Sequence, residues 1–201
     1  MTTSKPFTPS CEKNKAPILA VLLRHLADSK ELLEIGSGTG QHAVHMAAHL
    51  PKLRWHTSEL AAEHAGICAW LDEAKLPNLV PPAELDTQSE TWPVLATDAV
   101  YTANTCHIMS WKAVQAMFAG VARILNKGGL LLIYGPFNYD DAYTSPGNEQ
   151  FDHTLRARGT NSGIRDFEAM DELATLHGMA LIEDAEMPAN NRMLIWRSAG
   201  S

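Results

Sequence analysis

The feature that most constrains this chain is the segment at residues 31–43, which reads ELLEIGSGTGQHA. The apolar run Leu32–Ile35 has the length of one short buried strand. Three glycines at alternate positions then indicate a turn, and the residues from Gln41 to Leu50 continue as a helix. A strand, a glycine-rich turn and a helix in this order are typical of the first unit of a nucleotide-binding α/β fold.

The spacing of the glycines favours one class of ligand. A dinucleotide-binding loop carries a third glycine or alanine three positions after the second, and that position here is Gln41. Instead Glu34 precedes Gly36 by two residues, in the pattern E-x-G-x-G-x-G. A carboxylate repels a pyrophosphate but suits a ligand with an ammonium and a sulfonium. The segment resembles the first motif of class I S-adenosylmethionine (SAM)-dependent methyltransferases; an ordinary turn with glycines for packing is the alternative.

Composition limits the remaining possibilities. The 201 residues, 45% of them hydrophobic, suffice for one domain with a sizeable core. The net charge of −7 argues against a surface that follows phosphates, so we expect no nucleic-acid partner. The three cysteines form no CxxC motif or disulfide framework, which favours a reducing compartment. The apolar run at 18–23 is too short to span a membrane or to act as a signal, so we expect a cytoplasmic protein without a membrane partner.

The hydrophobic pattern predicts a single α/β domain with a Rossmann-like, doubly wound sheet of seven strands, the last of them antiparallel. We expect strands at 32–35, 53–57, 83–86, 98–104, 130–134, 179–185 and 193–197. We expect helices at 17–26, 41–50, 61–74, 113–125, 148–158 and 166–177, the fourth ended by the glycines at 128 and 129. Pro17 should begin the first helix, and residues 10–15 should precede it as a polar tail.

Two segments are candidates to cover the site. Residues 1–27 form an arm and a helix that could fold over it. Residues 135–163 turn polar and carry several prolines and glycines. A long loop is unusual in a compact domain unless it has a function, so a lid over the acceptor is favoured over a decorative insertion.

Further motifs carry a resemblance over nearly the whole chain, from Asn14 to Arg197. They are NK-x-PI at 14–18, EI-x-SGTGQHA at 34–43, I-x-x-W at 108–111, YGPF at 134–137 and EMPANN at 186–191. Together they are similar to the domain-of-unknown-function family that includes methyltransferase-like protein twenty-six. Glu59 departs from the aspartate expected there. The resemblance implies SAM as cofactor and S-adenosylhomocysteine (SAH) as product, and it names no acceptor.

The cofactor should lie against the glycine motif. Glu59 follows Gly40 by about twenty residues, where α/β nucleotide folds place the acid that binds ribose; a helix-start acid is the alternative. Asp86, at the end of the third strand, could accept a hydrogen bond from the adenine amino group. The expected cofactor-binding residues are Asn14, Glu34, Gly36, Ser37, Gly38, Thr39, Gly40, Gln41, Glu59, Leu60, Leu85, Asp86 and Asn104.

The acceptor should lie outside the carboxyl ends of the strands. His107, after the fourth strand, is the candidate catalytic residue, and a structural histidine is an equal alternative. The expected substrate-binding residues are Trp111, Tyr134, Asn148, Asp152, Arg156, Asn190 and Asn191. The two C-terminal asparagines could instead shape a tight turn. The histidines at 42, 45 and 49 share one helix face without an acid or cysteine, so no metal is expected.

These observations favour a methyltransferase that acts on a small molecule by in-line displacement from SAM. One alternative is a non-catalytic SAM-binding partner protein, whose binding motif would look the same. A nicotinamide-dependent oxidoreductase is less favoured, because the chain has neither a dinucleotide loop nor a Tyr-x-x-x-Lys pair.

Overall fold

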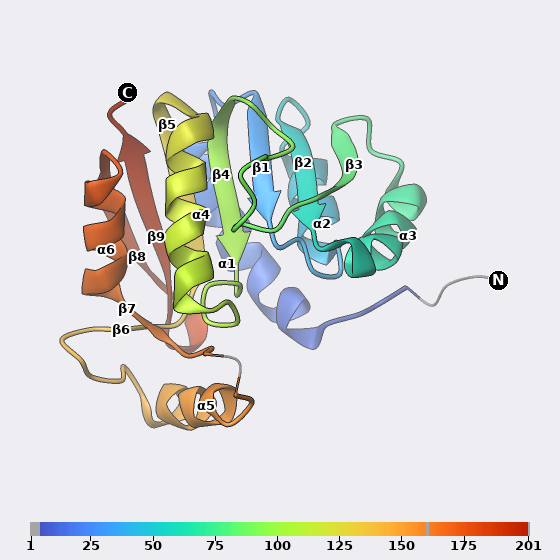
Figure 1. Cartoon of the computed structure of the whole chain (residues 1–201). Coiled ribbons are helices and arrows are strands. Elements are labelled where there is room, and N and C mark those ends of the chain that lie inside the picture. The colour runs from blue at the N-terminus through green and yellow to red at the C-terminus, as the bar shows by residue number, and fades with distance from the viewer. Residues whose placement is uncertain (1–4, 160, 201) are drawn as a thin grey trace.

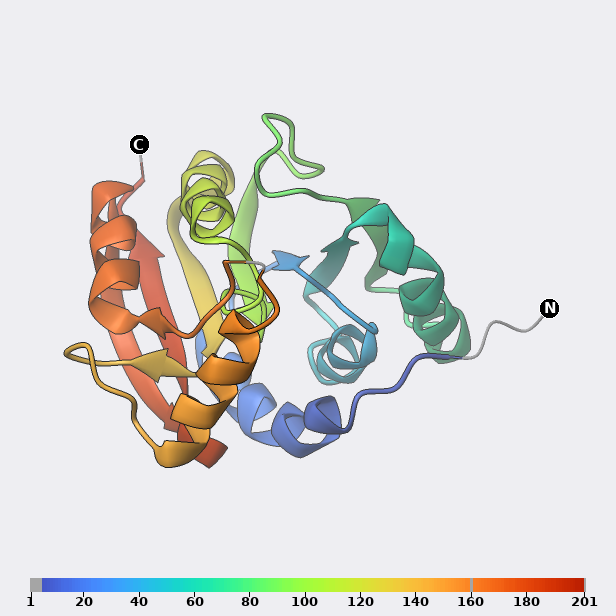
Figure 2. The ribbon, with the colours of Figure 1, turned by 60° about the horizontal axis from the view of Figure 1, so that its bottom comes forward.

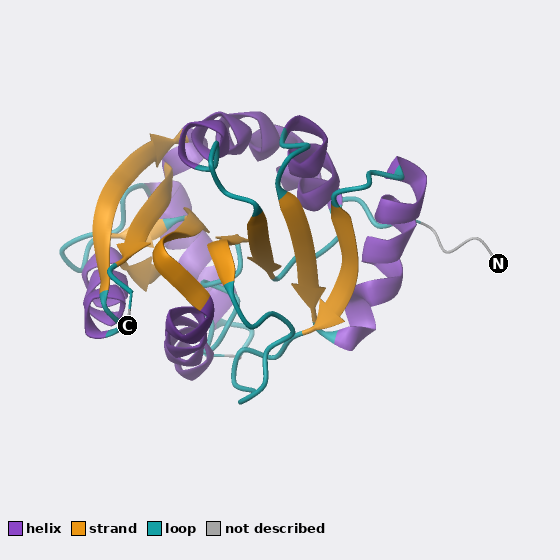
Figure 3. Cartoon of the chain, turned by 90° about the horizontal axis from the view of Figure 1, so that it is seen from above, coloured by secondary structure: helices purple, strands orange, loops and turns teal. Residues whose placement is uncertain are grey.

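A seven-stranded sheet with helices on both faces forms the centre of the molecule in the computed structural model, which describes residues 5–159 and 161–200 (Figures 1 and 3). Its strands run in the order β3-β2-β1-β4-β5-β9-β8. They are β1 (Glu31–Ile35), β2 (Arg54–Glu59), β3 (Leu79–Glu84), β4 (Thr97–Ala103), β5 (Leu125–Gly135), β8 (Met179–Met187) and β9 (Asn191–Ser198). The first five are parallel, and β9 is antiparallel to both of its neighbours. The predicted Rossmann-like sheet, with its last strand antiparallel and in a single domain, is confirmed.

Two helical layers bury the faces of this sheet. The helices are α1 (Pro9–His25), α2 (Gln41–His49), α3 (His64–Ala74), α4 (Trp111–Ile124), α5 (Pro146–Arg156) and α6 (Phe167–Leu176), with 3-10 turns η1 (Ala61–Glu63) and η2 (Pro188–Asn190). Side chains of β5 alternate between the layers, as a strand requires. Leu130 and Leu132 pack in the core with α1 and α2, whereas Leu131 and Ile133 pack with α4 and α6.

The topology places a crevice at one edge of the sheet. The parallel strands β1, β2 and β4 all end at the same edge, and β1 lies between the other two. The connections from β1 and β4 therefore leave in opposite directions, which opens a crevice outside the carboxyl ends of the strands. Figure 2 turns this edge forward and shows it bordered by α5, the first turns of α1, and the η1–α3 segment.

The first helix is longer than the sequence predicts. It begins at Pro9, and residues 10–15 are helical instead of forming a tail. Pro17 lies inside the helix, where its missing N–H leaves one intrahelical hydrogen bond unmade. The burial of Ile18 and Leu22, both fully inaccessible, offsets that loss. Residues 1–4 of the expected arm lie outside the described residues.

Two strands also differ from expectation. β3 includes Pro81 and Pro82, which the sequence places in a loop. Proline fits there because β3 is an edge strand, where one side of the backbone has no partner. β5 begins at Leu125 directly after α4, so the glycines expected to end that helix lie within the strand, beside a shift of register. A short parallel pair, β6 (Phe137–Asn138) with β7 (Arg165–Asp166), has no counterpart in the prediction.

None of the helices within the described ranges has the length and apolar character that crossing a membrane requires.

Candidate functional site

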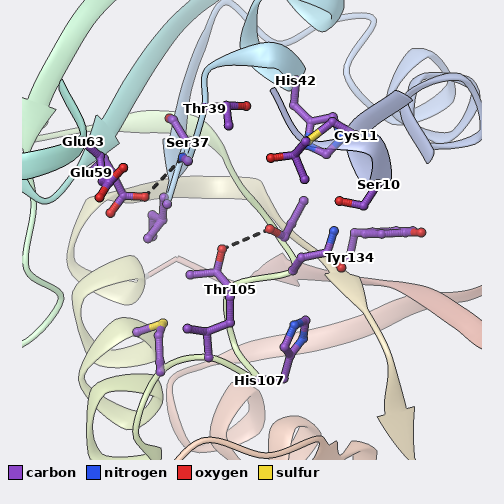
Figure 4. A pocket seen from close by; sticks show the side chains of 18 of the residues that line it. Ser10, Cys11, Ser37, Thr39, His42, Glu59, Glu63, Thr105, His107 and Tyr134 are labelled. Carbon is purple, nitrogen blue, oxygen red and sulfur yellow. Dashed lines mark hydrogen bonds between the residues drawn. The ribbon is translucent and has the colours of Figure 1, made fainter. Parts of the chain in front are cut away.

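A cavity of about 1200 Å³ opens at the carboxyl ends of the parallel strands. Loops after β1, β3 and β4 form its floor, and the start of α1, η1, α5 and the β8–β9 turn form its walls. Figure 4 shows some of the side chains that line it. Thirteen of the expected site residues line it: Asn14, Gly36, Ser37, Gly38, Thr39, Glu59, Leu60, Leu85, Asp86, Asn104, His107, Tyr134 and Asn191. The others do not line it: Glu34, Gly40, Gln41, Trp111, Asn148, Asp152, Arg156 and Asn190.

The glycines of the β1–α2 loop have different tasks. Gly38 has a φ of +55°, and a Cβ placed on it would meet nothing within 4 Å, so this part of the backbone faces open cavity. Gly40 has a φ of +87°, and a Cβ there would lie 3.2 Å from the Cα of Ile67 in α3. Gly40 therefore permits α2 to pack against α3, which is a role in packing rather than in ligand contact.

Glu34 supports the loop from beneath. Its side chain is only 2% exposed, and Oε2 accepts hydrogen bonds from Ser37 Oγ and Trp55 Nε1, both at 2.9 Å. Burial raises the pKa of this carboxyl to about 7, although both donors act in the opposite direction. The acid of the motif thus fixes the shape of the loop and does not itself line the cavity.

Glu59 faces the cavity from the end of β2 (Figure 4). Oε2 accepts from the N–H of Gly38 at 3.2 Å, and Oε1 accepts from the N–H of Leu60 at 2.9 Å. The two bonds hold the carboxylate against the glycine loop. Asp86 lies on the neighbouring loop, where Oδ1 accepts from the N–H of Gln88 at 2.9 Å.

The N-terminal segment is tied to the glycine motif. Gln41 Oε1 accepts from the N–H of Thr8 at 2.6 Å and from Thr39 Oγ1 at 3.1 Å. Asn14, which is 9% exposed and lines the cavity, has its Oδ1 2.7 Å from Nε2 of His42. Residues of α1 therefore form one wall of the cavity.

His107 lies in the loop after β4 and lines the cavity at 6% exposure. Its ring packs edge-on against Phe151 of α5, with centroids 5.3 Å apart, and its carbonyl accepts from the N–H of Gly163 at 2.9 Å. No described residue makes a hydrogen bond to either ring nitrogen. Burial, with a smaller effect from Arg165, lowers the pKa of this imidazole to about 4, so it is neutral at pH 7.

Three expected substrate residues instead fasten α5. Asp152 is fully buried and accepts from Tyr143 Oη at 2.7 Å and from the N–H of Ile164 at 2.6 Å, and it also pairs with Arg156. Asn148 Nδ2 donates to the carbonyl of Asn190 at 3.2 Å, which links α5 to the β8–β9 turn. These groups position the 135–163 segment beside the cavity.

The remaining two stand apart from the cavity for different reasons. Trp111 opens α4 and has the guanidinium of Arg165 at 5.8 Å from its ring. Asn190 is exposed and has a φ of +55°, within a turn whose neighbour Ala189 also has a positive φ. Asparagine adopts that conformation readily, so Asn190 has the turn-shaping role that stood as the alternative.

Several residues that line the cavity are not predicted from the sequence. They come from α1, the β4–α4 loop, α5 and the β8–β9 turn: Ser10, Cys11, Lys13, Thr105, Phe151, Leu155, Arg158 and Ala189. Phe151, Leu155 and Arg158 repeat at four and three residues, which is the spacing of one helix face and could have revealed them. Cys11 could not be singled out by pattern, and burial raises the pKa of its thiol to about 11.

Among the described residues, no three His, Cys, Asp or Glu side chains form a metal-binding group.

The strand order and the cavity define a Rossmann-like methyltransferase fold, and solved structures share it. An O-methyltransferase family protein from Burkholderia thailandensis matches with a TM-score of 0.82 at 15% identity, over 93% of this chain and 57% of that one. Human N-acetylserotonin methyltransferase in complex with SAM matches at 0.79 and 13% identity, over 96% and 53%. An O-methyltransferase family 2 protein from Planctomyces limnophilus, in complex with apigenin, matches at 0.74 and 13% identity, over 92% and 61%.

The chain spans between 53% and 61% of the length of these three structures. At such identities the likeness extends to the fold. The sequence assigns the chain to a narrower group, because residues 5–198 match the family described as "Protein of unknown function (DUF938)". The chain belongs to this family.

Proposed function

We propose that the protein binds SAM in this cavity and transfers its methyl group to a small-molecule acceptor, releasing SAH. The observation that carries the proposal is the pairing of Gly38 with Glu59: a glycine backbone open to the cavity, with a carboxylate held directly beside it. A ribose hydroxyl pair needs such an acceptor, and no Cβ blocks the approach. The proposal also agrees with the resemblance to the family that includes methyltransferase-like protein twenty-six.

The residues fit the parts of the cofactor by their chemistry. Glu59 would accept from the ribose and Asp86 from the adenine amino group, while Leu60 and Leu85 offer apolar surface to the base. Gly36, Ser37 and Thr39 would surround the amino-acid portion, and Asn14 and Asn104 would offer polar contacts. When bound, SAM supplies an electrophilic methyl group on a sulfonium, and the chain has only to position a nucleophile in line with it.

The N-terminus of α2 argues against a dinucleotide. A pyrophosphate in a Rossmann fold lies at the start of this helix, on free backbone N–H groups. Here the Gln41 side chain stands at that position and binds the backbone of Thr8, so the chain's own arm covers it. A nicotinamide cofactor would have to displace this contact.

The acceptor would occupy the other part of the cavity. His107 is proposed as the catalytic residue that contacts the nucleophile, with Tyr134 and Asn191 as neighbouring walls. Asn148, Asp152 and Arg156 would act through α5 as positioning residues, and Trp111 through Arg165. A small acceptor is consistent with the apigenin bound to one structural neighbour.

Two measurements test the proposal. Calorimetry should detect SAM and SAH but not NADH, and NADH binding without SAM binding would refute it. Incubation with methyl-labelled SAM and fractionated cell metabolites, followed by mass spectrometry, should then reveal a labelled product. SAM binding without label transfer from any fraction would favour the non-catalytic partner protein.

A further inference from the structure

The acids and the cations that line the cavity come from different elements. Its lining acids, Glu59, Glu63 and Asp86, all come from the η1 segment and the ends of β2 and β3. Its described lining cations other than histidine are Lys13 of α1 and Arg158, just past the end of α5. Figure 4 shows Glu59 and Glu63 on one side of the cavity and Ser10 of α1 on the other. The two lining cations therefore come from other elements than the three acids, in a chain of net charge −7.

Both cations are free to meet a ligand. Neither the Lys13 ammonium nor the Arg158 guanidinium has an ion pair or hydrogen bond to any described residue, although close neighbours do. Lys15 pairs with Glu12, and Arg156 pairs with Asp152. The neighbours are therefore occupied by pairs within their own helices, while Lys13 and Arg158 line the cavity with unpaired donors.

A third observation concerns His107. This residue is 6% exposed, lines the cavity and has no hydrogen bond from its ring to a described residue. Its ring nitrogens are not among the enclosed side-chain atoms that lack a partner, so they are open to the cavity and can meet a ligand or water. The Arg165 guanidinium adds positive charge nearby, since it donates to the carbonyls of Cys106 and Met109 on the same loop.

We propose that the acceptor is a small organic acid that binds as an anion, with its charged group at Arg158, its apolar body on Phe151 and Leu155, and its nucleophilic atom at His107, while Lys13 adds positive charge to the same cavity. Phe151, Leu155 and Arg158 lie along one face of the α5 segment, so a single extended molecule can meet all three. The inference rests on the proposed function and narrows it to one class of acceptor.

The chemistry agrees with an anionic acceptor. The acceptor atom forms a bond to the methyl carbon with its own electron pair, and the carbon–sulfur bond breaks with its pair retained on sulfur. The anion held at Arg158 anchors the molecule and is not methylated, because the nucleophile is a separate atom at His107. When that atom is a thiolate or phenolate, it has no proton to lose in this step, so a strong base is unnecessary. A neutral imidazole of low basicity, as His107 is, suffices to orient such an atom.

Matched pairs of ligands test the proposal. Benzoate, phenylacetate, 3-phenylpropionate and hexanoate, each with its neutral amide, are titrated by calorimetry at pH 7 into the protein with and without saturating SAH. At least one acid should bind tenfold or more tightly than its amide. Arg158→Gln and Lys13→Gln should each weaken that acid several-fold and leave the amide unchanged. Arg54→Gln changes the charge equally at the start of β2, the opposite edge of the sheet, and should have no effect.

The outcomes separate the two proposals. Equal binding of acids and amides, no binding of any acid, or an acid preference that survives both variants overturns the anionic acceptor. Failure of SAH to bind overturns the proposed function instead, and the titrations without SAH still measure the anion site. SAH affinity should stay within about twofold in Arg158→Gln.

Discussion

The two halves of the cavity are built in different ways. Most of the half assigned to the cofactor comes from the β1–α2 loop and the ends of β2 and β3, where Gly38 and Glu59 are joined by a direct hydrogen bond. The acceptor half is assembled from the start of α1, the loop after β4, α5 and the β8–β9 turn. Contacts between segments distant in sequence hold this half together: the carbonyl of His107 accepts from the N–H of Gly163, and the carbonyl of Asn190 accepts from Asn148 of α5. Local backbone geometry thus shapes one half, and contacts between distant segments shape the other.

The largest expected effect is a loss of cofactor binding, which concerns the cofactor half alone. Gly38→Val should weaken SAH binding more than about hundredfold, because a branched side chain fills space that faces the cavity and resists a φ of +55°. Calorimetry with SAH measures the loss. Gly178→Val is the matched control, since Gly178 has a φ of +72° and equally open surroundings in the turn before β8. Both variants should lose similar stability, about 1–2 kcal/mol. Equal SAH affinity in the two would place the cofactor elsewhere.

The same contrast explains what the sequence predicts well. The glycine motif predicts its half because a strand, a turn and a helix in succession fix their own geometry, so Gly38, Glu59 and Leu85 line the cavity as expected. Gly40 and Glu34 belong to the motif yet stand behind the wall, since a motif does not distinguish packing or support from contact.

The acceptor half is harder to predict because it depends on the ends of helices. Pro17 suggests a helix start, and that reading leaves Ser10 and Lys13 in a tail; the structure continues the helix back to Pro9 and brings both to the cavity. In α5, the polar residues Asp152 and Arg156 attract attention, yet they fasten the helix. The apolar Phe151 lines the cavity instead. Tertiary contacts decide which face of a helix is turned inward, and local propensity does not contain them.

A second prediction concerns the acceptor half alone, where methyl transfer should be lost while cofactor binding is kept. His107→Gln should lower methyl transfer roughly hundredfold while SAH affinity changes less than about twofold, because the ring contacts the nucleophile and not the cofactor. The assay follows label transfer from SAM with an acceptor fraction that supports turnover. His153→Gln is the control, since His153 lies on the exposed side of α5 and outside the cavity. A parallel loss of SAH binding and of melting temperature would make His107 a structural residue. Asn191→Ala should show the same pattern with a smaller loss.

A third prediction sharpens the boundary between the halves. Glu59→Ala should weaken SAH binding about ten- to hundredfold, because losing a hydrogen bond to a charged acceptor costs about 1.5–3 kcal/mol. Glu84→Ala is the control, since Glu84 ends the adjacent strand and does not line the cavity. Unchanged affinity in Glu59→Ala would leave this carboxylate the role of a helix-start acid that holds the Leu60 N–H.

The smallest expected effect is on the pH dependence of stability, and it concerns one buried histidine from each half. Burial lowers the pKa of both His42 and His107 to about 4, from an unfolded value near 6.5. The unfolded chain therefore binds more protons between these values, so each residue stabilises the fold above pH 6.5 and loses that contribution as the pH falls toward 4. When the pH falls from 7.5 to 5.5, each of the two histidines should lower the free energy of unfolding by roughly 1 kcal/mol.

Urea unfolding of wild type and His107→Gln at both pH values isolates this contribution. The free energy of unfolding of wild type should exceed that of His107→Gln by less at pH 5.5 than at pH 7.5. The reason is that only wild type loses stability when the low pKa of that ring opposes protonation. Glu34, whose raised pKa makes stability fall as the pH rises toward 7, acts equally in both proteins and cancels. An anionic ligand held at Arg158, in the same cavity as the His107 ring, should raise the pKa of His107 toward the normal value, whereas His42, already bound to Asn14 at 2.7 Å, should not respond. NMR titration of both rings with phenylacetate measures this directly. An identical response of the two histidines would remove the chemical distinction between the halves.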